Sequence, residues 1–598
     1  MIGQAPLLDT RSANQSSTLT STMIAELPTA IHNPFALVLT QAAATNGIMG
    51  QLNSTVDQNF SAFSLNGGRS MSSAILVDGA PDTAADWGGL LVAPSTDSVQ
   101  EMQIIGNTYD AQFGRSGGGV INIVTKGGSG DFHGRGFEFF QGDNLNATNW
   151  SSNRAFGDCN TAECNRLKKP EFKLHQFGGD LGGPLWKSKR VYFFGAYEGL
   201  RETTPGDSGS RTVPTAAERQ GDFSSSYNQD GTLQVLYNPF TTREVSPGQF
   251  IRDPFDPSCV GVTFPNTCAG NTIPQTLMDP VGAKVVGLLP NPTKAGDPIT
   301  HANNFFKTGS GKTVNDKIDT RIDWARSDKY TLFGRFTGRL RQNNFPACFY
   351  CNGGDEENGS RDPGFQLTLN NTFTPTTSWV INVLASSGRW VEEQISPALG
   401  KLTPASIGLD PKDYDAPLVP GFSIGGYAGI GPFFNQKVRK FPRYTSTLQI
   451  NATKERGRHS IKFGWVGESD LVNNLDRFSG NFSFDRGLTA GPDPAANADI
   501  STTGNGLASL LLGTASSGNS IFNADIASSL RYYGWYVQDD WRATPKLTLN
   551  LGVRYEIQPG GTERFNRLVV FDPNVASPLA ALTGLPLKGG LEYKSAKD

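Results

Sequence analysis

The segment 114–126 carries residue types that could bind phosphate. Its sequence, GRSGGGVINIVTK, contains four clustered small residues, Gly114, Gly117, Gly118 and Gly119. A Walker-type loop requires G-x-x-x-x-G-K-[S/T], but Lys126 comes directly after Thr125 and is followed by glycine. A dinucleotide fingerprint requires G-x-G-x-x-G at the start of a helix, whereas this cluster has the order G-x-x-G-x-G and precedes the β-branched run VINIV. The spacing therefore disfavours phosphate binding, and we expect the glycines to permit close backbone packing.

Catalytic and metal-binding patterns are not expected elsewhere in the chain. The five histidines are scattered, at His32, His133, His175, His301 and His459. They form neither an H-x-x-H nor an H-E-x-x-H motif, and no G-x-S-x-G nucleophile elbow is expected. The acidic stretch DPFDPSC (253–259) lies in a proline-rich loop that fixes acid–base geometry poorly, although a Ca²⁺ site there is an alternative. We therefore expect no catalytic residue, no metal centre, no cofactor and no enzymatic activity.

Six cysteines fall into three local pairs, Cys159 with Cys164, Cys259 with Cys268, and Cys348 with Cys351. In an oxidising compartment such pairs form disulfides that restrain loops, and we expect three of these bonds. Zinc binding by ACFYC (347–351) is a weaker alternative, because a four-ligand site needs a second pair and no histidine is near. A redox role would require a thioredoxin-like βαβ context, which the surrounding sequence lacks.

Composition narrows the class of protein. Of the 598 residues 37% are hydrophobic, 18% are charged and 10% are aromatic, and 69 are glycine. The formal net charge of −3 gives no support for nucleic-acid binding. No run approaches the roughly 18 apolar residues of a membrane helix, and the first residues lack the basic and apolar regions of a signal peptide. These features fit a soluble glycine-rich β protein or a transmembrane β-barrel, whose strands give a weak hydropathy signal.

Alternation of apolar and polar residues marks eleven candidate strands. The clearest are 316–324, 330–340 and 546–557, each with one apolar and one polar face. Their length of about ten residues spans a hydrocarbon layer as a tilted strand, whereas strands of soluble sandwiches usually have about five or six. Eight less regular candidates complete the set, at 132–142, 171–183, 189–200, 363–373, 377–391, 442–454, 459–469 and 530–542.

The connections between these segments are short and long in turn. Short ones lie at 187–189, 325–329, 374–377, 454–458 and 543–546, and long ones at 143–170, 201–315, 342–362, 392–441 and 470–529. Loops above about fifteen residues are rare in compact domains. Their strict alternation with tight turns is typical of an outer-membrane barrel, which has short periplasmic turns and long outer loops. All three cysteine pairs fall in long connections, and so on one predicted side.

Residues 1–130 lack such long strands. Shorter β-like runs occur there, at 73–79, 99–105 and 119–126. A barrel of more than about twenty strands has a lumen wide enough to hold a folded plug, so we interpret the glycine cluster with Arg115 as a crowded junction between plug and barrel. A buried arginine requires a carboxylate, and we expect Asp319, Asp323 or Glu556 to supply it from the lumen side. An exposed Arg115 on a loop is the alternative.

Residues 97–142 (DSVQEMQIIGNTYDAQFGRSGGGVINIVTKGGSGDFHGRGFEFFQG) resemble the plug-to-barrel junction of the Oar-like TonB-dependent receptors, which often carry a carboxypeptidase-regulatory-like domain. Other stretches similar to family landmarks are ELPTAIHNPFALV (26–38), ILVDGAPDT (75–83), FGGDLGGPL (177–185), YFFGAYEGLR (192–201), VPTAAERQGDFS (213–224), GLASLLLG (506–513) and YYGWYVQDDW (532–541). The resemblance covers nearly the whole chain. It implies an energy-coupled outer-membrane transporter with a barrel of about 22 strands and an N-terminal plug.

The expected fold is mostly β, with a plug domain at 1–130 and a partial transmembrane barrel with long outer loops at 131–598. The candidate strands are half of the about 22 that the resemblance implies, and an odd number of antiparallel strands does not close a barrel. No TonB-binding box is recognisable before the plug. We therefore expect a fragment or one product of a split gene.

The leading functional expectation is a receptor and transporter in the bacterial outer membrane. Its expected partners are outer-membrane lipid, a TonB-type inner-membrane energy-coupling complex and a large or scarce extracellular ligand whose identity the loops do not reveal. A surface adhesion or structural protein of the same fold is the first alternative, and a secreted soluble β enzyme is the second. Dependence on an energised inner membrane separates transport from adhesion, and extraction into water without detergent would indicate the enzyme.

Overall fold

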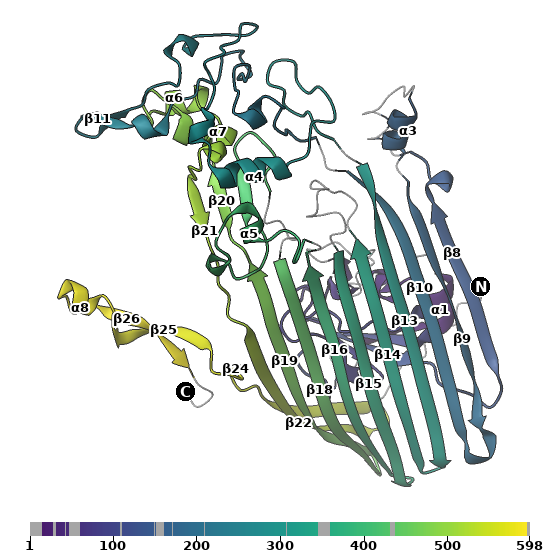
Figure 1. Ribbon diagram of the computed structural model, residues 1–598. Helices are drawn as coiled ribbons and strands as arrows, with labels where there is room; N and C mark the ends of the chain where they lie inside the picture. Colours follow the sequence, from purple (N-terminus) through teal and green to yellow (C-terminus); the bar gives the residue numbers. More distant parts are fainter. Residues whose placement is uncertain are drawn as a thin grey trace.

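The computed structural model of the protein contains one large sheet, a five-stranded sheet and several smaller hairpins (Figure 1). It describes residues 15–27, 32–41, 44–46, 60–107, 110–148, 150, 153, 161–169, 171–207, 210–306, 308–344, 359–396, 398–430 and 437–594. Within these ranges, no helix has the length and apolar character needed to cross a lipid bilayer.

The large sheet, called the wall below, follows one antiparallel path through eleven strands, each paired with the next along the chain. They are β8 (His133–Gly142), β9 (Lys173–Trp186), β10 (Val191–Asp207), β13 (Thr308–Ser327), β14 (Tyr330–Asn344), β15 (Gly359–Thr376), β16 (Trp379–Ile395), β18 (Lys437–Arg456), β19 (His459–Phe478), β22 (Ile526–Thr544) and β23 (Leu547–Ile557). Each coincides with one predicted strand, and several extend further toward the long loops. The predicted mostly β fold with long antiparallel strands is confirmed.

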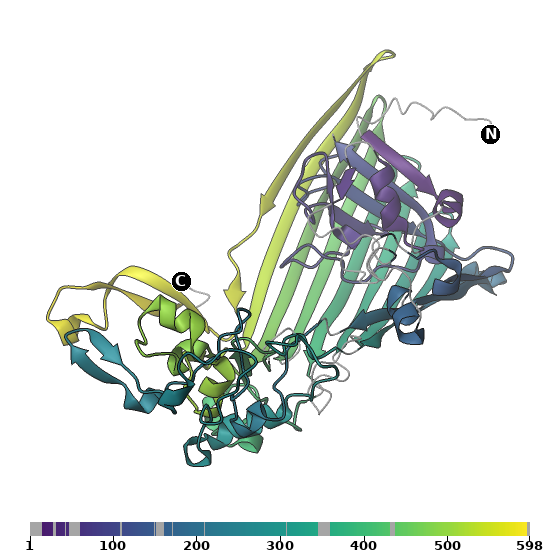
Figure 2. The same cartoon turned by 90° about the horizontal axis from the view of Figure 1, so that it is seen from above.

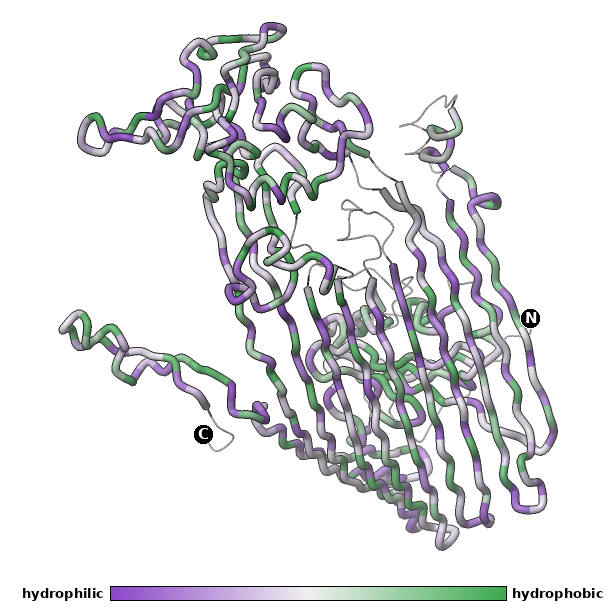
Figure 3. The backbone as a smooth tube through the Cα atoms, in the orientation of Figure 1, coloured by the Kyte–Doolittle hydropathy of each residue, from purple (hydrophilic) through white to green (hydrophobic). Residues whose placement is uncertain are grey.

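The short connections gather at one end of the wall and the long ones at the other (Figure 1). Tight turns join β9 to β10, β13 to β14, β15 to β16, β18 to β19, and β22 to β23. The predicted asymmetry of the connections is confirmed. Along each strand the tube in Figure 3 alternates between hydrophilic and hydrophobic residues. On β14, Arg335 and Thr337 are buried on the concave face, whereas Phe336 between them is exposed on the other.

A separate N-terminal domain, formed by the described residues between 15 and 125, lies in the hollow of the wall (Figures 1 and 2). Its sheet has the order β1 (Gln15–Thr20), β6 (Val99–Asn107), β7 (Val120–Thr125), β4 (Ala74–Val77) and β5 (Ala80–Pro81). The other elements are α1 (Ser21–Glu26), η1 (Pro34–Thr40), β2 (Ala44–Asn46), β3 (Phe63–Leu65) and η3 (Thr96–Ser98). Apolar side chains from both groups of elements form its core, including Leu19, Ile24, Phe35, Val38, Phe63, Ile75, Met102 and Ile121.

Three long connections fold together into an outer-loop unit, defined here as residues 210–306, 398–430 and 479–525. Its main elements are α4 (Pro280–Leu288), α5 (Pro404–Ile407), α6 (Asn497–Thr502), α7 (Gly506–Leu511), β11 (Arg243–Ser246), β12 (Gln249–Ile251), β17 (Gly421–Ile424), β20 (Asn481–Phe484) and β21 (Ser517–Asn519). Every residue of α7 is buried, and its leucines pack with Val285, Ile407 and Phe422 from the other two connections. One apolar core therefore holds all three connections together.

The remaining elements are short. The α-helices are α3 (Ala162–Lys168) and α8 (Ala580–Thr583), and the strands are β24 (Thr562–Glu563), β25 (Leu568–Ala576) and β26 (Lys588–Lys594). The 3₁₀ helices are η4 (Asp143–Leu145), η5 (Lys187–Lys189), η6 (Glu218–Gln220), η7 (Pro239–Thr241), η8 (Pro257–Cys259), η9 (Gln275–Leu277), η10 (Pro411–Asp413) and η11 (Arg486–Thr489). β24 pairs with β22, and β25 and β26 form a hairpin apart from the wall.

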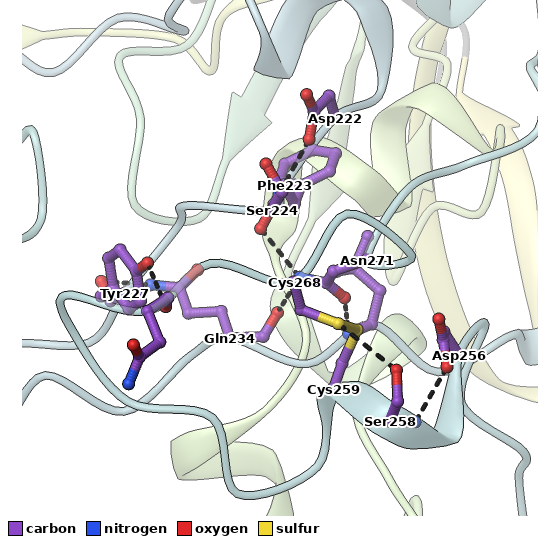
Figure 4. The surroundings of a disulfide bond; sticks show 12 residues. Asp222, Phe223, Ser224, Tyr227, Gln234, Asp256, Ser258, Cys259, Cys268 and Asn271 are labelled. Carbon is purple, nitrogen blue, oxygen red and sulfur yellow. Dashed lines mark hydrogen bonds between the residues drawn. A yellow bond between two sulfur atoms is a disulfide. The ribbon is translucent and has the colours of Figure 1, made fainter.

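One predicted disulfide, between Cys259 and Cys268, closes a loop of the outer-loop unit (Figure 4). Both cysteines are buried, and the Cys268 N–H donates a hydrogen bond to the carbonyl of Ser224 at 3.0 Å. Asp256 lies beside the two sulfur atoms, but sulfur atoms bonded to each other are not thiolate ligands for a metal. Cys164 is also disulfide-bonded. Its predicted partner Cys159 and the predicted pair Cys348 and Cys351 lie outside the described residues.

Replacing both Cys259 and Cys268 with serine is expected to lower the free energy of unfolding of the outer-loop unit by about 2–3 kcal/mol. The bond closes a short loop, and its removal restores loop-closure entropy to the unfolded chain. The urea concentration at which trypsin begins to cut the unit measures the loss. Ser258→Ala, which leaves the bond intact, is the control. Equal midpoints for the double variant and the control would contradict the prediction.

Candidate functional site

The loop between β6 and β7 approaches the wall where there is no room for a side chain. An added Cβ at Gly114 would overlap the side chains of Arg554 and Glu556 on β23. It would also lie within 3.0 Å of atoms of the N-terminal domain at Gly117, Gly118 and Gly119. Arg115 has a φ of +50°, in the left-handed region that few L residues adopt. The glycines therefore permit close approach both to the wall and within the N-terminal domain.

Arg115 reaches from this loop to two acidic side chains on β19. Its Nη1 forms an ion pair with Glu468 and lies 3.7 Å from Asp470 Oδ2. The guanidinium also lies 5.0 Å from the ring centroid of Tyr532 on β22. Glu468 and Asp470 are buried, and Thr445 on β18 donates a hydrogen bond to Asp470 at 2.7 Å. One cation thus faces two buried carboxylates across the interface.

Arg115 forms its ion pairs with carboxylates of the wall other than the three candidates named from the sequence, and those three have other contacts. Asp319 accepts hydrogen bonds from the Ser95 N–H at 2.8 Å and from a wall threonine. Asp323 pairs with Arg321 at 2.8 Å, and Glu556 accepts a hydrogen bond from the Tyr532 hydroxyl at 2.6 Å. All three lie on wall strands at the interface, but alternation does not show which strand the loop reaches.

A second buried cluster surrounds Asp78, in the turn between β4 and β5. Its Oδ2 lies 3.0 Å from Arg335 Nε on β14, although this N–H is not aligned for a hydrogen bond. Its Oδ1 lies 3.5 Å from Arg321 Nη1 on β13. Thr125 donates to both oxygens, from its N–H at 2.9 Å and its hydroxyl at 2.7 Å. Arg335 is almost wholly buried, with 1% of its side chain exposed. Asp78 therefore joins two strands of the N-terminal domain to two strands of the wall.

Further polar contacts connect the N-terminal domain with the rest of the wall. They are Asp86 with Arg443 (2.7 Å), the Thr96 N–H with Glu198 (3.1 Å), Asp97 with Arg135, Asp110 with Lys462 (2.7 Å), the Ala111 N–H with Gln538 (3.1 Å) and Lys126 with Asp180 (3.5 Å). The wall residues come from strands across the width of the sheet. Ion pairs and hydrogen bonds thus cross the interface along the width of the sheet, and an apolar contact lies where Trp87, Leu91 and Val92 meet Trp390.

His32 lies at the opposite edge of the same interface. Its N–H donates to Gln176 Oε1 at 3.0 Å, and Gln176 Nε2 donates to the His32 carbonyl at 3.0 Å. The imidazole packs on Phe139 of β8 with ring centroids 4.7 Å apart, and neither ring nitrogen has a hydrogen-bond partner among the described residues. Burial lowers the pKa of His32 to about 4, and the positive charges of Arg135 and Lys317 contribute.

Docking of the N-terminal domain is expected to weaken as the pH falls from about 6.5 to about 4. In this window a released, solvated His32 binds a proton and the docked one does not, so protonation favours release. The loss should be on the order of 1–3 kcal/mol. Urea midpoints from tryptophan emission at pH 7.5, 5.5 and 4.0 measure it. His32→Gln should remove this part of the pH dependence, whereas the exposed His133→Gln should retain it. Parallel pH curves for wild type and His32→Gln would exclude the assignment.

A cavity of about 560 Å³ separates part of the N-terminal domain from the wall. Four amide side chains line it on the wall side, together with Glu468 and Arg554, and the N-terminal domain contributes charged residues and apolar side chains such as Trp87. The amides are Asn370, Asn382, Gln449 and Asn451, and the charged residues of the N-terminal domain include Asp78, Arg115 and Arg69. The cavity borders both charge clusters. Its polar lining is suited to hold water or a polar solute.

Sequence reasoning missed three of these acidic residues. Asp78 stands in the stretch ILVDG, and its left-handed φ of +51° marks a tight turn that Asp tolerates. Glu468 and Asp470 are two positions apart on β19 and therefore share its inward face. The strand was predicted to end at 469, so this shared face was not recognised.

The stretch GFSIG (421–425) does have the G-x-S-x-G spacing of a nucleophile elbow, contrary to expectation. Ser423 lies within β17, which pairs with β20, and not on a strand-to-helix turn. No histidine hydrogen-bonds to Ser423 in the described part of the chain. The motif therefore lacks the geometry of a hydrolase site.

A family model for the outer membrane beta barrel domain matches residues 124–597, which is most of the chain. The chain belongs to the outer membrane beta barrel domain family. Members of this family reside in the outer membrane, so the predicted localisation is confirmed. As a member of the beta barrel domain family, the chain has its short turns on the periplasmic side and its long loops outside.

Comparison with individual proteins gives partial matches. Over 132 residues the chain is 37% identical to the TonB-dependent transporter Oar of Myxococcus xanthus, covering 22% of this chain and 12% of that protein. The outer membrane transporter YddB from Escherichia coli has a similar fold (TM-score 0.50, 11% identity, 92% of this chain and 58% of that one). The siderophore receptor PirA from Acinetobacter baumannii also matches (TM-score 0.46, 12% identity, 93% and 60%). The chain thus spans about an eighth of the curated relative and about three fifths of the solved chains.

Proposed function

We propose that this outer-membrane receptor takes part in TonB-dependent transport. The outer-loop unit captures a large or scarce ligand, and the N-terminal domain blocks the lumen until force from an inner-membrane complex displaces it. The observation that carries the proposal is the ionic docking of the N-terminal domain in the hollow of the wall. Charged groups are rehydrated on separation, which favours a domain that can leave the wall and return to it.

Energy-dependent movement of the N-terminal domain is the test of this proposal. Ala84 is buried at the interface, and an introduced cysteine there reacts with fluorescein maleimide only when the domain moves. Cells that produce the Ala84→Cys variant are suspended in spent culture medium and treated with fluorescein maleimide. The labelling is repeated in the presence of a protonophore and in cells that lack the inner-membrane complex. Transport predicts labelling that rises several-fold only in energised cells that contain the complex.

The control variant Val245→Cys places the thiol on the exposed hairpin of β11 and should be labelled equally in every condition. Size fractions of the spent medium that raise Ala84→Cys labelling would then contain the ligand. Unchanged labelling of Ala84→Cys, together with binding of cells to a surface, would favour the alternative of an adhesion or structural protein.

A further inference from the structure

The lipid-facing side of the wall contains an apolar groove across β18, β19, β22 and β23. Its volume is about 580 Å³, and its lining includes Ile450, Ala452, Phe463, Trp465, Trp535 and Tyr555. Strand register places Ile450 opposite Trp465, and Trp465 opposite Trp535, on the same face. Thr447 and Glu468, each an odd number of positions away from these residues along the same strands, are buried on the concave face. The groove is therefore on the outside of the wall, and its volume lies within the range of about 300–1,000 Å³ of ligand pockets.

A small residue, Ala452, lines the groove among large ones and is paired with Phe463 of β19. The ring of Phe463 meets that of Trp379 of β16 edge-on across β18, with ring centroids 6.2 Å apart. Nearer the edge of the wall, the ring of Trp535 lies 6.2 Å from that of Tyr555. Aromatic side chains therefore border the groove at both ends of its width.

One end of the groove carries positive charge. Lys454 lies two positions beyond Ala452 on the same face, a distance of about 7 Å along a strand. Its Nζ is 4.8 Å from the ring centroid of Trp379 and donates to Ser378 Oγ at 2.8 Å. Arg456 follows on the same face at the periplasmic turn and is exposed. Lysine beside an aromatic ring at this depth is typical of a membrane interface, where it meets lipid phosphates.

We propose that this groove is a specific site for one phospholipid of the periplasmic leaflet. An acyl chain occupies the hollow over Ala452, and the phosphate lies beside Lys454 and Arg456. Membrane localisation determines the occupant, because hydrocarbon is what contacts this face of an outer-membrane barrel. The apolar hollow and its cationic end match the two halves of a phospholipid. The site is independent of transport.

Photocrosslinking with a lipid probe tests the proposal. The full chain is extracted from outer membranes in mild detergent and reconstituted in phosphatidylethanolamine and phosphatidylglycerol vesicles that contain a phospholipid with a mid-chain diazirine. Crosslinked residues are identified by mass spectrometry. We expect at least threefold more crosslinks per residue in the groove than on the lipid-facing residues of β14 and β15. The excess should persist when detergent dilutes the bulk lipid.

A matched pair of variants tests whether the groove causes the excess of lipid crosslinks. Ala452→Phe fills the floor and should remove the excess labelling. Ala385→Phe makes the same change on the lipid-facing side of β16, outside the groove, and should leave the excess labelling unchanged. Uniform labelling of the wild-type wall would overturn the proposal, whether or not the variants fold. So would an excess that Ala452→Phe retains.

Discussion

Asp78→Asn is expected to release the N-terminal domain from the wall more readily than any change at an exposed ion pair. The substitution keeps the size of the side chain and suits the left-handed backbone at this position, because Asn tolerates that region. It removes the carboxylate that faces Arg335 and Arg321. The described contacts of Arg335 with other residues are hydrogen bonds to neutral groups, so its buried charge would lose its counter-ion.

Breaking a buried ion pair by removing one partner costs about 3–5 kcal/mol, because the remaining charge stays desolvated. Hydrogen exchange of the β4 and β7 amides measures the free energy of local opening. Asp328→Asn is the matched control, since it breaks an exposed pair with Arg190 and should leave the protection nearly unchanged. Arg335→Met in the Asp78→Asn background removes the unpaired charge and should recover part of the loss. Equal protection in Asp78→Asn and Asp328→Asn would refute the prediction.

The wall could be predicted because its signal is local. A strand with one face in hydrocarbon and the other on a polar interior repeats every two residues, whatever its neighbours are. The strand ends were less accurate. β13 begins at Thr308 and not at 316, and β19 continues to Phe478 and not to 469. Beyond the hydrocarbon layer the outward positions need not be apolar, so alternation fades while backbone pairing continues.

The outer-loop unit and the interface contacts could not be predicted because they depend on distant parts of the chain. The apolar helix α7 is buried because two earlier connections, 210–306 and 398–430, fold over it. Gly282 approaches it so closely that a Cβ would overlap the carbonyl of Leu510. In the same way, the glycine cluster indicated a crowded junction, but the choice of Glu468 over Glu556 depends on the path of one loop across the lumen. Local sequence patterns therefore predict neither the burial of α7 nor the ion-pair partner of Arg115.

Arg115→Gln is expected to open the cluster of Arg115, Glu468 and Asp470 and to detach the loop between β6 and β7 from the wall. The change leaves Glu468 and Asp470 close together and buried with no cation between them, and the stacking on Tyr532 is lost as well. Two like charges in a desolvated site repel each other, and we expect the loop to detach at a cost of about 3 kcal/mol. That cost raises the detached population by about two orders of magnitude.

Hydrogen exchange of the backbone amides of residues 110–119 would detect the detachment in Arg115→Gln. Arg115→Lys restores the charge without the planar guanidinium and should recover most of the protection. Arg69→Gln removes a positive charge beside the same cavity, where no ion pair of Arg69 is described, and should leave the exchange unchanged. Adding Glu468→Gln and Asp470→Asn to Arg115→Gln should restore docking, because no buried charge then lacks a partner. If this triple variant exchanges as fast as Arg115→Gln, the loss of charge pairing is not the cause.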